Sequence, residues 1–484
     1  MEAIANFFVS TGFYQFFQGD NWKSAIMLVI AVVLLFLGIV KKFEPLLLVP
    51  IAFGMLVTNL PGAEMFHEIL FAGGHVHWDL FGGEPITAQF LSEMLANGVS
   101  ADMLQPYADS LMTAAQSTFD PGVLDNLMAQ LAASGSEAVG TLSNQLDALV
   151  TAEQYLASYG ITLSNVTVSV GLIDVLYLGI KLGIYPCLIF MGVGAMTDFG
   201  PLIANPKSLL LGAAAQLGIF LTYVGCRLLG FTGAEASSIG IIGGADGPTA
   251  IFTTIKLAPH LLGPIAIAAY SYMALVPVII PLVVKLLCSK KELMINMKEQ
   301  EKLYPSKTEI KNLRVLKIIF PIAVTTIVAL FVPTAVPLIG MLMFGNLIKE
   351  IGSDTSRLFD AAANSIMNAA TIFLGLSVGA TMTSEAFLNW TTIGIVVGGF
   401  LAFALSISGG IFFVKLFNLF SKKKINPLIG ATGLSAVPMA SRVCNEIATK
   451  YDPKNHVLNY CMSSNISGVI GSAVAAGVLI SFLG

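Results

Sequence analysis

The stretch "IIGGADGPTAIF" (residues 241–252) decides the fold, because it puts a carboxylate among helix breakers inside an apolar chain. The breakers that surround Asp246 are Gly243, Gly244, Gly247 and Pro248. Glycine and proline interrupt a helix, so nearby backbone carbonyls lose their helical partners. A carboxylate near the centre of a bilayer costs a few kcal/mol. With the hydroxyl of Thr249, the stretch therefore predicts an interrupted membrane helix that carries an oxygen-rich cation site. The alternative is a helix cap at the membrane surface.

The composition is that of a membrane protein. Of 484 residues, 55% are hydrophobic and only 11% are charged, with a mean hydropathy of +0.80. Soluble proteins carry about 25% charged residues. Several apolar runs approach or exceed the roughly 20 residues that a spanning helix needs, such as 24–40, 208–225, 263–284 and 391–413. We predict an all-α polytopic protein with about 9–11 transmembrane helices.

Charge divides the chain into segments. No Lys or Arg occurs between Lys42 and Lys181, and twelve carboxylates lie between Glu64 and Glu153. By contrast, 289–314 carries seven basic residues and 421–426 carries three. Because positive loops stay in the cytoplasm, we place both basic segments inside and the acidic region outside. The predicted segments are 1–60 (an interfacial N-terminus and the first membrane helices), 61–168 (an acidic helical insert), 169–288, 289–314 and 315–484.

The two large membrane segments resemble each other faintly. The stretch "LIFMGVGAMTDF" (188–199) returns as "TIFLGLSVGATMT" (371–383), with the Ile-Phe pairs 183 residues apart. The same offset carries Gly247 onto Gly430, inside "NPLIGATGLSAVP" (426–438). Interrupted segments at matching places in two halves point to a transporter binding site. The pattern predicts two inverted repeats with interrupted helices, although Gly-rich segments can also align by chance.

Several polar residues elsewhere have both a functional and a structural interpretation. Asn426 and Ser435 lie in the second interrupted stretch, and Asn465 lies in an apolar run where an amide needs partners. Gly468, Gly471 and Ser472 suit helix packing as well as ligation. Arg442 and Glu446, at i and i+4, favour an ion pair, although Arg442 could instead meet an anionic substrate. The five cysteines form no CxxC pair and read as buried apolar residues. We predict no nucleic-acid partner, and His75 with His77 makes a weak metal pair.

The chain resembles the β subunits of the biotin-dependent, sodium-pumping decarboxylases that act on oxaloacetate, methylmalonyl-CoA and glutaconyl-CoA. The resemblance covers residues 22–60 and 169–484 and rests on "PLLLVPIAFGMLVTNLP", "YPCLIFMGVGAMTDFGPLIANPKSLLLGAAAQ", "GGADGPTAIF", "AYSYMALVP", "NPLIGATGLSAVPMASRV" and "NISGVIGSAVAAG". The region 61–168 departs from it, since we expect a family member to join its early helices by a short connection.

The resemblance implies a function and a set of site residues. It implies that the subunit decarboxylates carboxybiotin supplied by a biotin carrier subunit, consumes a proton and moves Na⁺ outward. The residues implied for Na⁺ are Asp246, Asn426, Gly430, Ser435 and Asn465. Those implied for catalysis are Asp246, Ser435 and Tyr272, the last as proton donor, although a lone membrane tyrosine also suits packing. Arg442 is the candidate for carboxybiotin.

The resemblance also implies partners and a location. It implies a carboxyltransferase subunit, a biotin carrier, a small membrane γ subunit, surrounding lipid, a β homotrimer and a bacterial or archaeal inner membrane. The alternative function is a secondary Na⁺-coupled carboxylate symporter without decarboxylase chemistry, and biotin dependence separates the two. A channel is disfavoured, because it needs an open path. Neither the acyl substrate nor the choice among Na⁺, Li⁺ and H⁺ follows from the sequence.

Overall fold

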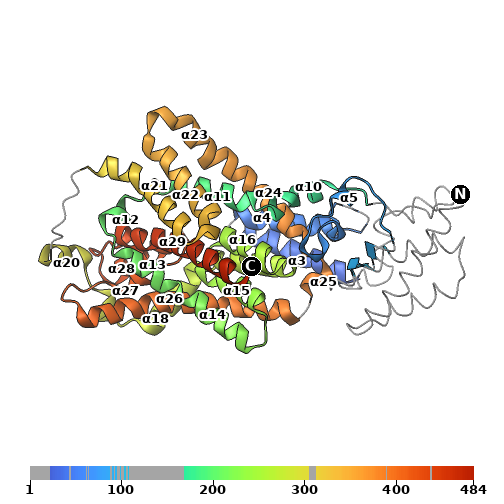
Figure 1. The fold of residues 1–484 in the computed structure, drawn as a ribbon. Coiled ribbons are helices and arrows are strands. Elements are labelled where there is room, and N and C mark those ends of the chain that lie inside the picture. Colours follow the sequence, from blue (N-terminus) through green and yellow to red (C-terminus); the bar gives the residue numbers. More distant parts are fainter. Residues whose placement is uncertain are drawn as a thin grey trace, which may run out of the picture. The chain divides into compact units, whose positions relative to one another are not determined.

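The fold is all-helical in the part of the chain that the structure, a computed structural model, describes (Figure 1). That part comprises residues 22–42, 45–61, 168–304, 312–388, 390–436 and 439–484, with portions of 63–107. The predicted interfacial segment at 1–21 and most of the acidic region lie outside the described residues. The prediction of an all-α polytopic membrane protein is confirmed.

Two compact units make up the chain. The first comprises Met1–Gly62 and Leu176–Gly484, and the second is Ala63–Val175. In the second unit, the buried carboxylate of Asp174 accepts hydrogen bonds from the backbone N–H groups of His67 (2.7 Å) and Gly171 (2.8 Å), and it pairs with the His67 ring (2.8 Å). His77 bonds the carbonyl of Ala72 at 3.0 Å. The predicted segment boundaries stay a prediction.

Seven helices among the described residues are long and apolar enough to cross a membrane. The bent pair α10–α11 (67°) and the pair Pro259–Met273 with Val276–Leu287 (69°) raise the number to nine if each is one span. The predicted range of 9–11 is therefore met only at its lower end. The longer helices are α3 (Trp22–Ile39), α21 (Leu313–Phe331), α22 (Val336–Ile351), α24 (Met367–Ala380), α26 (Trp390–Phe420) and α29 (Leu458–Leu483).

The other helices are short, and two of them together form a further span of the seven, Ser208–Leu228. The apolar ones are α4 (Pro45–Thr58), α10 (Leu172–Lys181), α11 (Ile184–Met196), α13 (Ser208–Ala215), α14 (Leu217–Leu228), α16 (Gly247–Leu257), α17 (Leu262–Ala274) and α18 (Val276–Leu287). The remaining α-helices are α5 (Trp78–Phe81), α12 (Gly200–Ala204), α15 (Gly233–Gly240), α19 (Lys290–Leu293), α20 (Met297–Leu303), α23 (Ser356–Asp360), α25 (Ser384–Phe387), α27 (Pro427–Ala431) and α28 (Met439–Tyr451). The 3₁₀ and π turns are η1 (Glu68–Gly74), η3 (Ile241–Gly244), η4 (Pro259–Leu261), η5 (Pro333–Ala335), η6 (Ser353–Thr355) and η7 (Ala361–Ile366).

Close helix pairs hold the first unit together. A methyl group on Gly345 of α22 would lie 1.9 Å from the carbonyl oxygen of Met191 in α11, and one on Gly194 would lie 1.8 Å from that of Leu342. Both helices therefore touch backbone to backbone, as small residues permit inside membranes. The two stretches of the predicted repeat fall in α11 and α24. The inverted arrangement itself stays a prediction.

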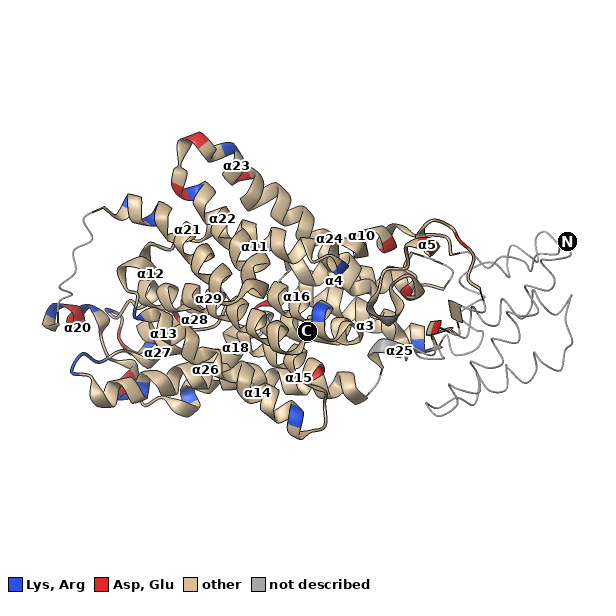
Figure 2. Cartoon of the chain, in the orientation of Figure 1, with Lys and Arg blue, Asp and Glu red and all other residues tan. Residues whose placement is uncertain are grey.

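Charged residues of the first unit gather on the short helix α20 and near α23, and they leave the middle of the bundle almost free of charge (Figure 2). This distribution is the one that a bilayer requires, because lipid solvates no ion. Asp246 is an exception in the interior, where it is 4% exposed.

Candidate ion-binding site

Asp246 stands where a helix breaks and a new one begins. The 3₁₀ turn η3 ends at Gly244, and Ala245 adopts a left-handed conformation with φ of 54°. Asp246 then caps α16, and its Oδ1 accepts the backbone N–H of Thr249 at 3.1 Å. Proline is tolerated in the first turn of a helix because its missing N–H is not needed there. The sequence "GGADGP" therefore interrupts the helix, as predicted. Asp246 caps the next helix, as in the alternative interpretation, but it is buried.

Two serines from distant segments bind the other carboxylate oxygen. Ser435, in the loop after α27, and Ser472, in α29, each donate a hydroxyl to Asp246 Oδ2 at 2.8 Å. The backbone N–H of Ser435 also donates to the carbonyl of Gly244 at 3.0 Å. Hydrogen bonds to a charged group contribute about 1.5–3 kcal/mol each. The interrupted stretch 427–436 thus meets the one around Asp246, which joins Ser435 and Asp246 as predicted.

A glutamine that the sequence analysis missed lies beside this cluster. Gln216 separates α13 from α14 and is 5% exposed. A methyl group on Gly244 would lie 3.5 Å from the side-chain oxygen of Gln216. The same methyl group would lie 3.1 Å from Cβ of Ser472. The side-chain oxygen of Gln216 is buried and has no hydrogen-bond partner among the residues that the structure describes. The sequence gives one indication of Gln216, which is the single amide side chain in the apolar run 208–225.

The asparagines and the glycine predicted for Na⁺ have structural partners. Asn426 donates to the carbonyls of Leu293 (2.9 Å) and Ile295 (3.0 Å), and it caps α27. Gly430 packs closely against Gly410 of α26. A methyl group on Gly430 would lie 2.2 Å from the carbonyl oxygen of Gly410.

Asn465 also bridges elements. It donates to the carbonyl of Leu434 and accepts the hydroxyl of Ser441 at 3.4 Å. The contacts of Asn426, Gly430 and Asn465 shape the loop that carries Ser435. A direct ligand role for these three residues stays a prediction.

Tyr272 packs against α26. Its hydroxyl donates to the carbonyl of Val396, and its ring fills the space over Gly399. Tyr270, two residues earlier and 1% exposed, lies against Gly247 instead, where a methyl group would come within 2.1 Å of its ring. The tyrosine ring that touches the residue after Asp246 is therefore Tyr270. The role predicted for Tyr272 is untested.

Arg442 and Glu446 are both exposed on α28, and within the described residues no ion pair joins them. The i, i+4 pair that one interpretation of the sequence favoured is therefore wrong. Side chains in such exposed positions gain little from pairing, because water solvates each charge well.

A cavity of about 1150 Å³ lies among α12, α13, α20, α26, α28 and α29. Lys298 and Lys423, from the two basic segments, line it together with Lys207 and His456. Ser208 and Ser463 also line it, and their hydroxyls are 2.5 Å apart. The cavity is large enough for a small organic molecule. Its lining holds three lysines against one carboxylate, Glu301, so its excess of positive charge suits an anion.

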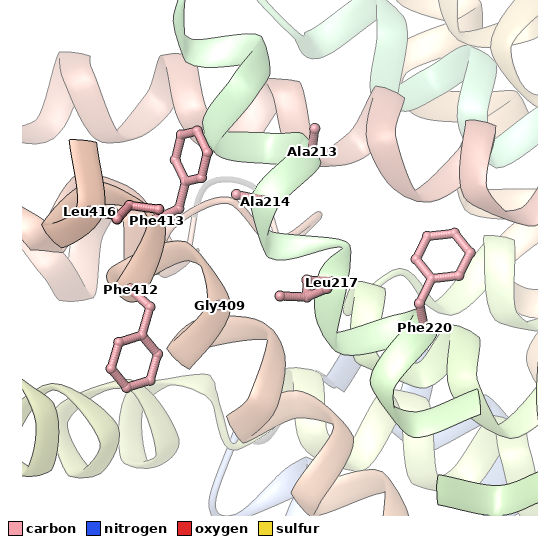
Figure 3. A pocket seen from close by; sticks show the side chains of 8 residues that line it. All are labelled: Ala213, Ala214, Leu217, Phe220, Gly409, Phe412, Phe413 and Leu416. Atoms are coloured by element: carbon pink, nitrogen blue, oxygen red, sulfur yellow. The ribbon is translucent and has the colours of Figure 1, made fainter. Parts of the chain in front are cut away.

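A second pocket, of about 570 Å³, lies between α13–α14 and α26 (Figure 3). Its side chains are all apolar, and four of them are roughly half exposed: Leu217, Phe220, Phe412 and Leu416. It offers no oxygen ligand, so it is not the ion site. In a bilayer, such side chains contact lipid tails.

Comparison with known proteins gives one consistent family. The family described as "Na+-transporting oxaloacetate decarboxylase beta subunit" matches residues 23–483. The methylmalonyl-CoA decarboxylase subunit beta of Propionigenium modestum is 47% identical, with 100% of both chains covered. The oxaloacetate decarboxylase beta chain of Klebsiella pneumoniae is 44% identical over 95% of each chain. The glutaconyl-CoA decarboxylase subunit beta of Acidaminococcus fermentans is 40% identical over 100% of this chain and 98% of its own.

These comparisons correct one expectation. The alignment with the Propionigenium protein spans 485 residues and the full length of both chains. The Propionigenium protein therefore has a counterpart of region 61–168, so the region is not an insertion with respect to that protein. The expected short connection is wrong for the Propionigenium protein. The acidic composition of the region suggested that it departs from the family pattern. The composition of one sequence, however, does not show which segments its relatives contain.

The family match covers residues 23–483, and the relatives are 40–47% identical. The structure is consistent with this family, because it has a buried carboxylate at an interrupted helix of a polytopic bundle. The chain belongs to the family of Na⁺-transporting oxaloacetate decarboxylase beta subunits, the translocating membrane subunits of Na⁺-transporting decarboxylases.

Proposed function

We propose that this subunit decarboxylates carboxybiotin presented by a biotin carrier subunit, consumes a proton and drives Na⁺ outward. The observation that carries the proposal is Asp246, a buried carboxylate at a helix break held by two hydroxyls. Loss of CO₂ leaves a biotin anion that must take up a proton, so the chemistry creates a demand for protons.

Na⁺ and the proton compete for Asp246. A carboxylate sealed from water is stable when a cation or a proton neutralises it. Ser435 and Ser472 both donate to one of its oxygens, which leaves acceptor capacity on the carboxylate for a cation. A proton delivered to Asp246 displaces Na⁺, which links chemistry to transport. Tyr272 is the proposed proton donor, from the family resemblance.

Carboxybiotin enters from the basic face. The cavity lined by Lys207, Lys298 and Lys423 offers cations to its carboxylate. Arg442, exposed and without an ion pair to Glu446, is a further candidate to meet this anion.

A polar seam between α13 and α29 links the cavity with the ion site. It begins at Ser463 and Ser208 and continues at Ser467, which donates to the carbonyl of Leu209 at 3.2 Å. It ends at Ser472, about 13.5 Å further along the helix axis than Ser463 at 1.5 Å per residue. We propose that these hydroxyls mark the direction in which a small cation or a proton moves between the two places.

Other subunits complete the system. We propose a carboxyltransferase, a biotin carrier and a small membrane γ subunit as partners, with three copies of this chain in the complex. The location proposed is the inner membrane of a bacterial or archaeal cell. Each of these follows from the family alone.

The test measures chemistry and transport in one preparation. The complete complex is reconstituted in proteoliposomes, and ²²Na⁺ uptake and decarboxylation are followed while carboxybiotin is supplied. We expect wild type to couple the two and Asp246→Asn to lose both, because an amide neither carries a charge nor exchanges a proton near neutral pH.

Asp198 provides the matched control. Burial alone would raise the pKa of this carboxyl, but hydrogen bonds from Lys317 (2.6 Å) and the Gly200 N–H lower it below its usual range. Asp198→Asn therefore removes a carboxylate that already has a partner, and coupling should survive. If wild type moves Na⁺ down its gradient without responding to carboxybiotin, the proposal is wrong and the symporter alternative holds.

A further inference from the structure

Gln216 interrupts a membrane span at the level of the ion site. Ser208–Leu228 is one 21-residue apolar span, and Gln216 separates its two helices. An amide in such a run costs free energy unless its donors and its acceptor all find partners. The side chain is 95% buried, since only 5% of it is exposed.

The orientation of the Gln216 amide is fixed by its neighbours. Its nitrogen donates to the carbonyls of Gly212 (3.1 Å), Gly433 (3.4 Å) and Gly468 (3.4 Å). Carbonyl oxygens only accept hydrogen bonds, so the nitrogen has to face them and the amide cannot be flipped. The side-chain oxygen must therefore point the other way.

That oxygen points to the segment that carries Asp246. It lies 3.5 Å from the position that a methyl group on Gly244 would occupy, two residues before Asp246. Ser472 Cβ lies 3.1 Å from the same position, and its hydroxyl binds Asp246. Glycine at 244 thus leaves room between the amide oxygen and the serine that holds the carboxylate.

The oxygen of Gln216 has no hydrogen-bond donor among the described residues. Leaving a buried acceptor without a donor destabilises a protein. A bound hard cation would remove that cost, because such ions prefer carboxylate, carbonyl and hydroxyl oxygens. We propose that the side-chain oxygen of Gln216 is a ligand of the cation bound at Asp246. This proposal rests on the proposed function, in which Asp246 holds Na⁺.

The test measures the Na⁺ concentration that gives half-maximal decarboxylation by the complete complex. Gln216→Met keeps the length of the side chain and removes the oxygen. We expect the half-maximal Na⁺ concentration to rise about tenfold or more, while the rate at saturating Na⁺ changes less. If the Met variant does not fold, Gln216→Asn, which withdraws the oxygen by one methylene, takes its place.

Asn346 of α22 is the matched control. It is 1% exposed, its nitrogen donates to the carbonyls of Gly194 (3.3 Å) and Thr197 (2.9 Å), and its oxygen also has no partner. Asn346→Leu removes a similar buried amide from another helix pair, and we expect it to leave the Na⁺ requirement unchanged. A second readout, free of turnover, is the rise in melting temperature on adding Na⁺, which Gln216→Met should weaken.

The outcomes separate this inference from the proposed function. If folded Gln216→Met or Gln216→Asn keeps the wild-type Na⁺ requirement while Asp246→Asn loses its response to Na⁺, the Gln216 ligand is wrong and Asp246 stands. The inference also fails if Asn346→Leu shifts the requirement as far as Gln216→Met does. If Asp246→Asn responds to Na⁺ as wild type does, the proposed function itself is overturned.

Discussion

Ser472 shows how one hydroxyl can belong both to packing and to a site. It follows Gly468 and Gly471 in a run of small residues, and its backbone environment is that of a tightly packed helix. Its side chain nevertheless donates to Asp246 at 2.8 Å and to the carbonyl of Val469 at 3.0 Å. The packing interpretation of Ser472 is therefore incomplete.

Ser472→Ala should raise the Na⁺ concentration needed for half-maximal activity about ten- to a hundredfold, as expected for a lost hydrogen bond of roughly 1.5–3 kcal/mol. Without this donor the anionic carboxylate is less favoured, so a proton competes better with Na⁺ at a given pH. Decarboxylation measured against Na⁺ concentration checks it. Ser408→Ala, which removes a hydroxyl bonded only within its own helix to Ala404, should have no such effect. A Ser472→Ala curve that overlies wild type would contradict the prediction.

At the scale of elements, glycine contacts decide where helices meet. Gly194 and Gly345 allow α11 and α22 to touch, and Gly410 with Gly430 does the same for α26 and α27. These contacts carry no chemistry, yet the second pair positions the loop that bears Ser435. Gly430 is thus important to the site even without acting as a ligand.

Gly345→Val should sharply reduce the yield of folded protein, because its Cβ would lie 1.9 Å from the carbonyl oxygen of Met191 and neither backbone can yield. Elution as a single peak from size-exclusion chromatography and the melting temperature in detergent measure this. Gly340→Ala on the same helix is the control, since its nearest neighbour would be 3.6 Å away. Equal melting temperatures for the two variants would show that α11 and α22 do not meet as described.

At the scale of the whole molecule, charge placement predicts topology. The basic segments 289–314 and 421–426 and the acidic region 61–168 differ in sign, and the positive-inside rule places them on opposite sides of the membrane. The rule weakens for long segments, so this prediction calls for a direct measurement.

Cysteines introduced as Lys298→Cys and Glu84→Cys should react with a membrane-impermeant maleimide from opposite sides of oriented vesicles. Cys187 and Cys288, the partly exposed native thiols, are replaced first, because Cys226, Cys444 and Cys461 are buried. Detergent-opened vesicles provide the control for total reactivity. Labelling of both positions from one side would disprove the predicted topology.

Local chemistry explains which parts of the site the sequence could predict. Glycine and proline act on their own neighbours, so the helix break beside the carboxylate of Asp246 could be inferred directly. The partners of Asp246 lie 189 and 226 residues away in the chain, and no local pattern encodes such distances. Ser435 was found through the second interrupted stretch and the family resemblance, whereas Gln216, a single amide in an apolar run, was overlooked. Tyr270 and Tyr272 were inseparable in sequence, although helical geometry turns them to different faces.

The donors that hold Asp246 are two hydroxyls and one backbone amide, all electrically neutral. Under the proposed function, the site then has zero net charge with Na⁺ or a proton bound and one negative charge when empty. Carrying one elementary charge through the full membrane potential takes about 2.3 kcal/mol per 100 mV. A loaded site crosses without electrical work, whereas an empty one is held back or driven by the voltage. With neutral donors, the membrane voltage therefore acts on the empty site and not on the loaded one.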